Sequence, residues 1–464
     1  MFFVMCLAFT KAQNPDIKRT NHWYFGNGAG IDFSSGTATP DTLGKLHTWE
    51  GCAVMSDTLG NLLFYTDGDT VWDKNHTLMP HGYGLFGCVN LGSTAQAAVI
   101  VPRPYYPFQY YIFTNDCQEN SGALGFRYTL VDLTLNAGAG DIDTTQKNVL
   151  LFSPNTEGVA VTYKCNKKDY WVVVHEFGNS NYRIYSVDSS GVNNIPQVIP
   201  IGHVYNDKAC LLRFSSDGSM LATADNAAIL SECSTLYRFD NFNGVISNGI
   251  RLIGFVIGGL YIPEFSFDNS KLYINEANTF LRQYDLSLGI DSASINNSRI
   301  LVSQSSGSTM MALSKAPDGK IYFSNVFSDT IGTIDSSNIS GIGCAVHQKS
   351  LNIKRQMNLG LPNFISNYLY QGALLNNCSE GINELEKINF NIFPNPATDW
   401  IFIEGKELDS FTVFDITGRI IIHNKASPSD NINKVNISSL AEGLYLLTIK
   451  CNNKILTKKI IINK

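Results

Sequence analysis

The stretch LLRFSSDGSMLATAD, residues 211–225, places two runs of strand-forming residues on either side of an Asp217-Gly218 turn. Asp-Gly supplies the positive φ angles that a tight turn between antiparallel strands requires. The stretch therefore predicts a β-hairpin.

The same pattern occurs six times between residues 54 and 325. The other copies are VMSDTLGNLLFYTD (54–67), IVPRPYYPFQYYIFTN (100–115), AVTYKCNKKDYWVVVHE (160–176), EFSFDNSKLYINE (264–276) and ALSKAPDGKIYFSN (312–325). Successive turn centres lie about 47, 60, 51, 51 and 50 residues apart. A period of this length is typical of a repeat architecture.

A further strand that ends near an aspartate follows most of these hairpins, as in YRIYSVDSSG, TLYRFDNFNG, FLRQYDLSLG and TIGTIDSSNISG. Each unit therefore offers about four strands. One such sheet cannot bury both of its faces alone, so the units are expected to stack around an axis. The prediction is an all-β fold with a β-propeller over residues 21–372, of seven blades, with six as the alternative.

The seventh blade is expected to combine the two ends of this region, NLGLPNFISNYLY (358–370) and HWYFGNGAGIDF (22–33), because such closure removes exposed sheet edges.

Gly26, Gly28 and Gly30 also suggest a phosphate loop. A phosphate loop leads into a helix, however, whereas the residues after Gly30 continue as a strand and no lysine follows. These glycines therefore predict a turn that closes the ring.

The repeat ends before QGALLNNCSEGINELEKI (371–388), which predicts a linker over residues 373–388. Short strands separated by Asn, Gly and Ser turns follow over residues 389–464. They predict a small Ig-like β-sandwich.

Four blocks of this second region, IFPNPATDWIFI, FTVFDITGRIII, ISSLAEGLYLLTI and TKKIIINK, run in order to the last residue. They contain Pro394, Asn395, Pro396, Gly418, Gly443, Tyr445, Lys458 and Lys459. In these blocks the region resembles the type A sorting domain of the type IX secretion system of Bacteroidota. The resemblance implies that the secretion machinery is a partner, and that the protein passes through the periplasm to the cell surface or the medium. A generic Ig-like sandwich is the alternative.

The propeller region has its own resemblance, carried by Trp23 to Phe33, Ser56 to Gly68, Val71-Trp72 and Met79 to Gly82. These residues resemble a group of Bacteroidota surface proteins with the pattern WYFGNxAGLDF. That resemblance implies binding at the cell surface and brings no established activity.

Composition and the chain start narrow the class of protein. The net charge of −6 and the pI of about 5.8 exclude the basic surface that nucleic acid requires. No apolar run reaches the roughly 18 residues of a membrane helix. MFFVMCLAFTKAQN has a short apolar core from Phe2 to Phe9 and predicts a signal peptide over residues 1–12, although no lysine or arginine precedes that core.

Ten cysteines are present and none forms a CxxC pair, so no zinc site is expected. Cys210 and Cys233 could form a disulfide between neighbouring strands. Buried thiols are the alternative.

The densest polar and aromatic loop is YTDGDTVWDKNHTLMPHG, residues 65–82. It gives the candidate ligand-binding residues Asp67, Asp69, Trp72, Asp73 and His76. Its carboxylates could bind calcium, but the order of an EF-hand is missing, so no cofactor other than calcium is considered. The tryptophan could stack on a sugar ring. Aspartates that cap turns are the alternative.

No catalytic residue is identified, since no nucleophile or zinc motif is present. The sequence predicts an exported propeller that binds glycan or protein. The alternative is a hydrolase or lyase acting on polysaccharide at the axial face of the propeller. That alternative requires acid groups from different blades to converge at one end of the axis, which depends on the geometry between blades.

Overall fold

The computed structural model describes residues 14–88, 92–205, 210–225, 234–253, 260–289, 291–305, 307, 309–370, 390–405, 408–416, 419–425, 432–451 and 454–464. The chain divides into two compact units, residues 1–378 and 379–464. This division falls within the segment that the sequence predicts to be a linker.

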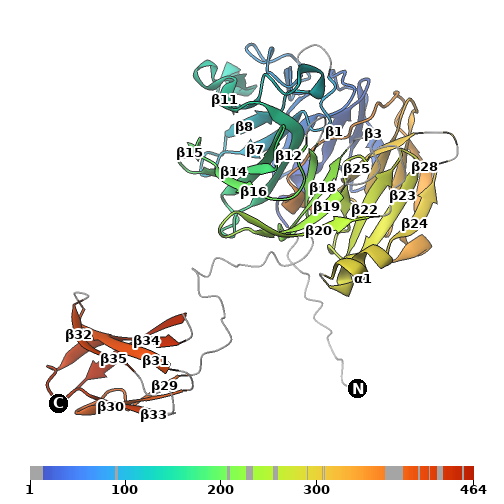
Figure 1. The fold of residues 1–464 in the computed structure, drawn as a ribbon. Helices are drawn as coiled ribbons and strands as arrows, with labels where there is room; N and C mark the ends of the chain where they lie inside the picture. The colour runs from blue at the N-terminus through green and yellow to red at the C-terminus, as the bar shows by residue number, and fades with distance from the viewer. Residues whose placement is uncertain are drawn as a thin grey trace, which may run out of the picture. The chain divides into compact units, whose positions relative to one another are not determined.

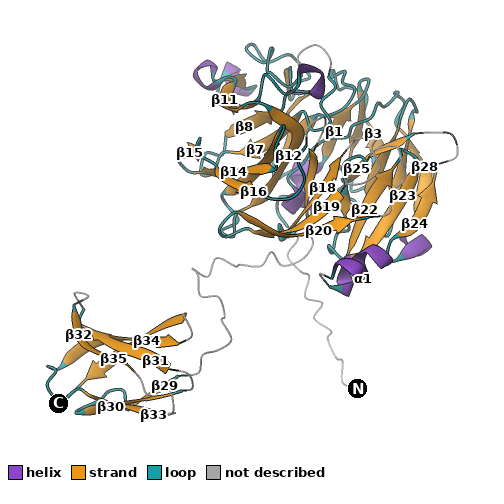
Figure 2. Cartoon of the chain, viewed as in Figure 1, coloured by secondary structure: helices purple, strands orange, loops and turns teal. Residues whose placement is uncertain are grey.

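The first unit contains seven antiparallel sheets among its described residues (Figures 1 and 2). Two have three strands: β1 (His22–Phe25), β2 (Ala29–Asp32) and β3 (Thr39–Pro40), then β4 (Ala53–Ser56), β5 (Leu62–Thr66) and β6 (Val71–Asp73). The third contains β7 (Ala98–Pro102), β8 (Gln109–Thr114), β9 (Phe126–Asp132), β10 (Asp141–Ile142) and β11 (Val149–Phe152). The fourth contains β12 (Asn155–Tyr163), β13 (Tyr170–Glu176), β14 (Asn181–Asp188), β15 (Gly191–Val192) and β16 (Gln197–Pro200).

The last three sheets of this unit are four-stranded meanders. They are β17 (Cys210–Phe214), β18 (Met220–Asp225), β19 (Ser234–Asp240) and β20 (Val245–Leu252); β21 (Glu264–Phe265), β22 (Lys271–Glu276), β23 (Phe280–Asp285) and β24 (Ile300–Gln304); and β25 (Met310–Lys315), β26 (Ile321–Asn325), β27 (Thr330–Ile334) and β28 (Val346–Asn352). The helices are short: η1 (Ile17–Thr20), η2 (Gln118–Asn120), η3 (Asn136–Gly138), η4 (Thr144–Gln146), η5 (Leu286–Leu288), α1 (Ser292–Asn297), η6 (Gly341–Cys344) and η7 (Ser366–Leu369).

All six predicted hairpins are present, as the turns β4–β5, β7–β8, β12–β13, β17–β18, β21–β22 and β25–β26. Their turn chemistry is local. In the β17–β18 turn, Asp217 Oδ1 accepts hydrogen bonds from Ser215 Oγ (2.6 Å) and Ser219 N (3.0 Å), and Gly218 has φ +75°. The carboxylate fixes the turn and glycine takes the left-handed position at no steric penalty.

The sheets are arranged as the blades of a β-propeller. Every residue of the first strands β4, β12, β17 and β25 is buried, whereas the last strands β16, β20, β24 and β28 are largely exposed. Successive first strands are neighbours from β1 through β4, β7 and β12 to β17, and β21 contacts β25. The predicted fold class is confirmed, with seven sheets.

The two ends of the repeat region meet and close the ring. The Trp23 ring lies 5.6 Å from the Tyr322 ring of the seventh sheet and 6.0 Å from the Phe364 ring. Asn27 N donates to Gln356 O at 3.2 Å. The N-terminal strands therefore lie beside the segment that follows the last blade, and Gly26 and Gly28 lie in the turn between β1 and β2, as expected. The prediction that residues 22–33 and 358–370 share one blade is wrong, because β3 completes the sheet of β1 and β2 and residues 358–370 contain no strand.

Two buried amides join the inner strands across the axis. Gln96 Nε2 donates to Val159 O (3.1 Å) and Leu212 O (2.9 Å), and its Oε1 accepts from Leu212 N (2.8 Å). Asn363 Nδ2 donates to Ala98 O (3.4 Å) and Val159 O (3.3 Å). These buried polar contacts therefore connect the third, fourth and fifth sheets to the closing segment, by which we mean residues 353–370 after β28.

A buried ion cluster lies between the next inner strands. Glu264 Oε2 is 3.4 Å from Arg213 Nε, and Glu264 Oε1 is 3.4 Å from Lys315 Nζ. All three side chains are at most 5% exposed. One carboxylate here is paired with two cations, which offsets the desolvation of each charge.

The second unit is a β-sandwich of two sheets. One contains β29 (Asn391–Phe393), β30 (Trp400–Glu404) and β33 (Ile432–Asn436), and the other β31 (Leu408–Phe414), β32 (Ile420–Lys425), β34 (Gly443–Cys451) and β35 (Lys454–Ile462). Ile401 and Ile403 from the first sheet share one core with Val413, Leu447 and Ile460 from the second. The small sandwich predicted for this region is present.

One disulfide is present among the described cysteines whose partners are both described, and it does not involve Cys210. Cys210 is a buried thiol 3.9 Å from Tyr182 Oη, so for this residue the buried-thiol alternative is confirmed and a Cys210–Cys233 disulfide is wrong; Cys233 lies outside the described residues. Cys210 lies inside the core between the fourth and fifth sheets, which explains the buried thiol. Cys88 and Cys117 form a disulfide instead, with Cα atoms 5.0 Å apart.

Gly26 gives a test of ring closure. It has φ +56°, and a Cβ atom there would lie 2.9 Å from Met357 Cα and 3.0 Å from Asn358 N. Gly26→Ala should therefore lower the thermal midpoint of the first unit, through left-handed strain of about 1 kcal/mol and a further 1–3 kcal/mol from overpacking. Gly36→Ala is the control, because Gly36 has φ +84° and open space around it. Equal melting temperatures for the two variants would contradict the closure contact.

Candidate functional site

The predicted ligand residues of the 65–82 loop lie in two turns. Asp67 Oδ1 accepts from Asp69 N (3.0 Å) and Thr70 N (2.8 Å), in the turn between β5 and β6. Burial raises the pKa of Asp67 to about 6, although these N–H groups oppose the shift. Burial also raises the pKa of Asp69, whose Oδ1 has no hydrogen-bond partner.

The other three residues pack inwards. Asp73 Oδ1 accepts from the backbone N–H groups of residues 75 and 77, at 2.8 and 2.9 Å. The Trp72 ring stacks on Tyr65, with centroids 5.5 Å apart and planes inclined by 13°. His76 Nδ1 lies 3.1 Å from Tyr65 Oη, and burial lowers the pKa of His76. Local turns and packing therefore account for most of these side chains, and ligand binding here stays a prediction.

The acid groups of this loop do not bring three side-chain ligand atoms within 4.8 Å of one another. In the part of the chain that the structure describes, one group of three side chains brings potential ligand atoms within 4.8 Å of one another, and it consists of Cys88, Cys117 and Glu119. Two of these are joined in the disulfide. Calcium binding by the loop is not tested by the structure.

A different cluster lies at the axial end where the first strands begin. Trp49 N and Glu50 N both donate to Gly92 O, at 3.1 and 3.0 Å, just before β4. Glu157, near the start of β12, accepts from Ala95 N at Oε2 (2.9 Å). The segment 92–95 thus bonds the main chain of Glu50 and the side chain of Glu157, two residues at the starts of different sheets.

Both glutamates have raised pKa values. Burial raises the pKa of Glu50 well above its usual range, and the negative charges of Glu157 and Glu119 raise it further. Burial also raises the pKa of Glu157, to about 7, although Ala95 N and Gln118 N donate to its carboxylate. Among the described residues, no hydrogen bond or ion pair joins the Glu50 carboxyl to a protein group.

A buried tyrosine responds to the charges of these acids. Tyr261 is 0% exposed, and its Oη has no hydrogen-bond partner among the described residues. Burial raises the pKa of Tyr261, and the negative charges of Glu50 and Glu157 add to the shift. We call Glu50, Glu119, Glu157 and Tyr261 the axial acid cluster.

Two exposed aromatic rings lie next to the cluster. Trp49 is 46% exposed and Phe327 is 60% exposed, and their rings meet edge to face with centroids 5.9 Å apart. Phe327 lies in the turn between β26 and β27. The closing segment links it to Trp49: Phe327 N donates to Met357 O, and Leu359 N donates to Trp49 O. Large apolar rings that stay exposed beside an unpartnered acid favour a ligand-binding surface.

The sequence analysis missed this cluster although it carries a signal. EGCAV (50–54) and EGVAV (157–161) are two copies of a Glu-Gly pair, one just before the inner strand β4 and one near the start of the inner strand β12. The glycines are required by close packing, since a Cβ atom would lie 2.2 Å from Ala97 N at Gly51 and 1.7 Å from Cys210 O at Gly158. The shared position in the repeat brings the preceding glutamates to the same end of the axis.

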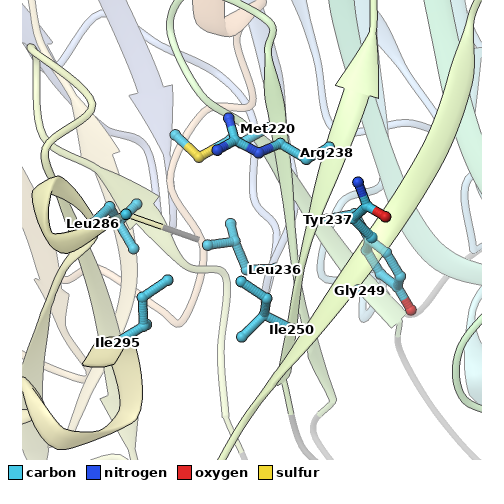
Figure 3. Close-up of a pocket in the computed structure, with 10 residues that line it drawn as sticks. Met220, Leu236, Tyr237, Arg238, Gly249, Ile250, Leu286 and Ile295 are labelled. Carbon is cyan, nitrogen blue, oxygen red and sulfur yellow. The ribbon is translucent and has the colours of Figure 1, made fainter. Parts of the chain in front are cut away.

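A pocket of about 340 Å³ lies against the outer strands of the fifth sheet (Figure 3). Leu236 and Ile250 form one wall, and Leu286 and Ile295 from the β23–β24 connection form the other. Arg238 lies at its edge, and no carboxylate, histidine or thiol is present among the described lining residues. The pocket therefore offers apolar contact without acid–base chemistry.

The sorting residues lie on both sheets of the second unit. Asn395 Nδ2 donates to Lys459 O (2.9 Å), and Asn395 Oδ1 accepts from Ile461 N (2.8 Å). This side chain therefore joins the connection between β29 and β30, which contains Pro394 and Pro396, to β35. Gly443 begins β34, and Tyr445 Oη donates to Ala441 O at 3.1 Å.

Lys458 and Lys459 are exposed on β35, and Gly418 lies outside the described residues. The described sorting residues are thus turn and edge positions of one sandwich.

Solved structures with similar folds have low sequence identity to this chain. PorZ of Porphyromonas gingivalis, described as an essential surface component of the type IX secretion system, has 10% identity and a TM-score of 0.40, with 96% of this chain and 60% of that chain covered. Hsv2 of Kluyveromyces lactis has 9% identity and a TM-score of 0.40, with coverage of 68% and 90%. A putative 6-phosphogluconolactonase of Bacteroides uniformis has 12% identity and a TM-score of 0.36, with coverage of 80% and 94%.

The chain thus spans 60% of the length of PorZ. A search of curated proteins finds no match. No described helix is both long and apolar enough to cross a membrane.

The family comparison concerns the second unit. Residues 391–463 match the family described as the secretion system C-terminal sorting domain. The match covers both sheets of the sandwich and agrees with the resemblance seen in the sequence. Residues 391–463 belong to this family, and the protein is exported by the type IX secretion system to the cell surface or the medium.

Proposed function

We propose that the protein is a type IX-secreted β-propeller that binds carbohydrate at the axial acid cluster. The observation that carries this proposal is the pair of exposed rings of Trp49 and Phe327, which meet edge to face next in the chain to Glu50, whose carboxyl has no partner among the described residues. The sequence resemblance to surface proteins of the WYFGNxAGLDF pattern supports a binding role.

The chemistry of the cluster suits a sugar. Aromatic rings offer flat apolar faces, and a carboxyl group accepts or donates hydrogen bonds according to its protonation. A sugar ring presents apolar C–H faces and hydroxyl groups that are both donors and acceptors. Trp49 and Phe327 would contact the faces, while Glu50 would bond the hydroxyls.

The second candidate is a polysaccharide hydrolase or lyase. It is favoured by one observation: Glu50 and Glu157, two acids from different sheets, both have raised pKa values, and the charge of Glu157 adds to the shift of Glu50. A carboxyl group that stays protonated near neutral pH can act as a general acid. Sustained release of reducing ends, abolished by Glu50→Gln, would favour this function over binding alone.

Deletion of residues 385–464 tests export. The truncated protein should accumulate in the periplasm, because residues 1–378 form a compact unit of their own and the sorting domain is removed. The measurement is immunoblotting of cell fractions and medium. Normal arrival of the truncated protein in the medium would contradict the role of the sorting domain.

Trp49→Ala tests the binding surface. On a glycan array followed by titration, the full-length protein should bind at least one oligosaccharide, and the variant should bind it about tenfold more weakly, since the stacking surface is lost. Phe108→Ala is the matched control. Phe108 is 57% exposed in the β7–β8 turn, at the opposite end of its strands. An equal loss in both variants would contradict an axial site.

Glu50→Gln tests the ionisation of the cluster. An acid whose pKa is higher in the folded state lowers stability as pH rises above its unfolded pKa, since the native protein then holds the proton more tightly. Glu50→Gln should therefore raise the thermal midpoint by a few degrees at pH 8 and leave it unchanged at pH 4.

Glu276→Gln is the contrasting variant, because Glu276 is buried and paired with Arg282 and Arg299. It should lower the midpoint at pH 8. A Glu50→Gln effect that is the same at both pH values would contradict the raised pKa.

A further inference from the structure

One wall of the pocket in Figure 3 is a single face of the fifth sheet. Leu236 and Arg238 lie two positions apart on β19, so their side chains leave the sheet on the same side. Met220 of β18 is the cross-strand partner of Arg238, and Ile250 of β20 is the partner of Leu236. These four side chains therefore form one continuous surface, which is apolar except for the guanidinium at one end.

The opposite wall is the β23–β24 connection, which is fixed against the same sheet. Asn296 of α1 bonds the main chain at the end of β20: its Oδ1 accepts from Ile253 N (2.8 Å), and its Nδ2 donates to Arg251 O (3.0 Å). Ile295, the preceding residue, is buried, and Leu286 is half-buried. Both line the pocket. The two walls are thus held together by hydrogen bonds, and the pocket is formed without a ligand, as is usual for small-molecule sites.

A β-bulge borders the pocket. The pairing of β19 with β20 shifts by one residue between Leu236 and Arg238, so β20 carries an extra residue there. In this stretch Asn248 has φ +50°, and a Cβ atom at Gly249 would lie 2.7 Å from Tyr237 Cε1. Bulges redirect side chains and are frequent beside functional sites. The irregular backbone therefore places the Asn248 amide in the lining, close in sequence to the partner of Arg238.

The polar side chains at the mouth of the pocket are available to a ligand. Arg238 and Asn248 are both exposed, and neither side chain makes a hydrogen bond or an ion pair with a described residue. No carboxylate among the described lining residues competes for the guanidinium. A guanidinium matches the two oxygens of a carboxylate, and an amide adds further donors. The pocket therefore suits an anion with an apolar body.

We propose that this pocket binds a medium-chain fatty acid, with its carboxylate at Arg238 and its hydrocarbon chain between the two apolar walls. The site shares no residue with the axial acid cluster, so the proposal does not depend on carbohydrate binding. The volume of about 340 Å³ is at the lower end of the range for ligand pockets, which favours a medium chain over a long one.

A peptide with a free carboxyl terminus fits the pocket less well. Its backbone N–H and C=O groups would need hydrogen-bond partners on leaving water. Apart from Tyr237, Arg238 and Asn248, the described lining residues have no nitrogen or oxygen in their side chains. A hydrocarbon chain needs no such partners, and burial of its surface is favourable.

The experiment is titration calorimetry of the full-length protein with octanoate and with octanamide. These ligands share the same chain and differ in charge. Octanoate should bind about tenfold more tightly, because the charge-assisted hydrogen bond to Arg238 is lost in the amide, and this advantage should shrink as salt is raised. Equal affinities would overturn recognition of the carboxylate. Absence of octanoate binding at millimolar concentration would overturn the proposal.

Two arginine variants locate the site. Arg238→Gln should weaken octanoate binding about tenfold and leave both octanamide binding and the melting temperature unchanged, since the side chain is exposed and bonds no described group. Arg355→Gln is the matched control. Arg355 is also exposed and without a described partner, and it does not line the pocket. Equal losses in the two variants would overturn the assignment to this pocket.

Leu286→Trp tests the apolar part of the pocket, because the larger side chain should occupy it and abolish binding of both ligands. A folded variant that still binds octanoate would overturn the site, and if the variant fails to fold, the two arginine variants decide. An N-acetylated peptide ending in leucine that binds more tightly than octanoate, with the same dependence on Arg238, would overturn the assignment to a fatty acid.

Discussion

The propeller depends on the amide side chains that connect its inner strands. These strands are buried on both faces, so their polar groups must be paired inside the protein. Gln96 and Asn363 each bond the main chain of two or more neighbouring strands, and Arg213, Glu264 and Lys315 continue the connection around the axis. The same contacts fix the starts of the inner strands, and the axial acid cluster lies at that end.

Much of the fold could be predicted because its signals are local. An Asp-Gly turn such as that at Asp217 specifies its hairpin through bonds to residues two positions away. The period of about 50 residues then predicts a propeller, and the four C-terminal blocks indicate the sorting domain. The cysteines were less predictable, since the position of Cys210 depends on a core shared by two sheets.

The axial acid cluster could not be located from spacing alone. Glu50 and Glu157 belong to different blades, and their proximity follows from how sheets pack around the axis. The residues chosen from composition, Asp67 and Asp73, lie where a dense run of aspartates is explained by capping of two turns. The two Glu-Gly pairs at the starts of inner strands are a better guide, because glycine there marks close approach between blades.

Closure of the ring by both chain ends also determines when the first unit can finish folding. Asn358 Nδ2 bonds Thr48 O across a sequence separation of 310 residues. Contacts of such long range require closure of a large loop and slow the final folding step. During synthesis the early blades therefore lack their ring-closing contacts, and strand edges stay exposed, until the last segment of the unit has left the ribosome. A dependence on chaperones before export follows from this architecture.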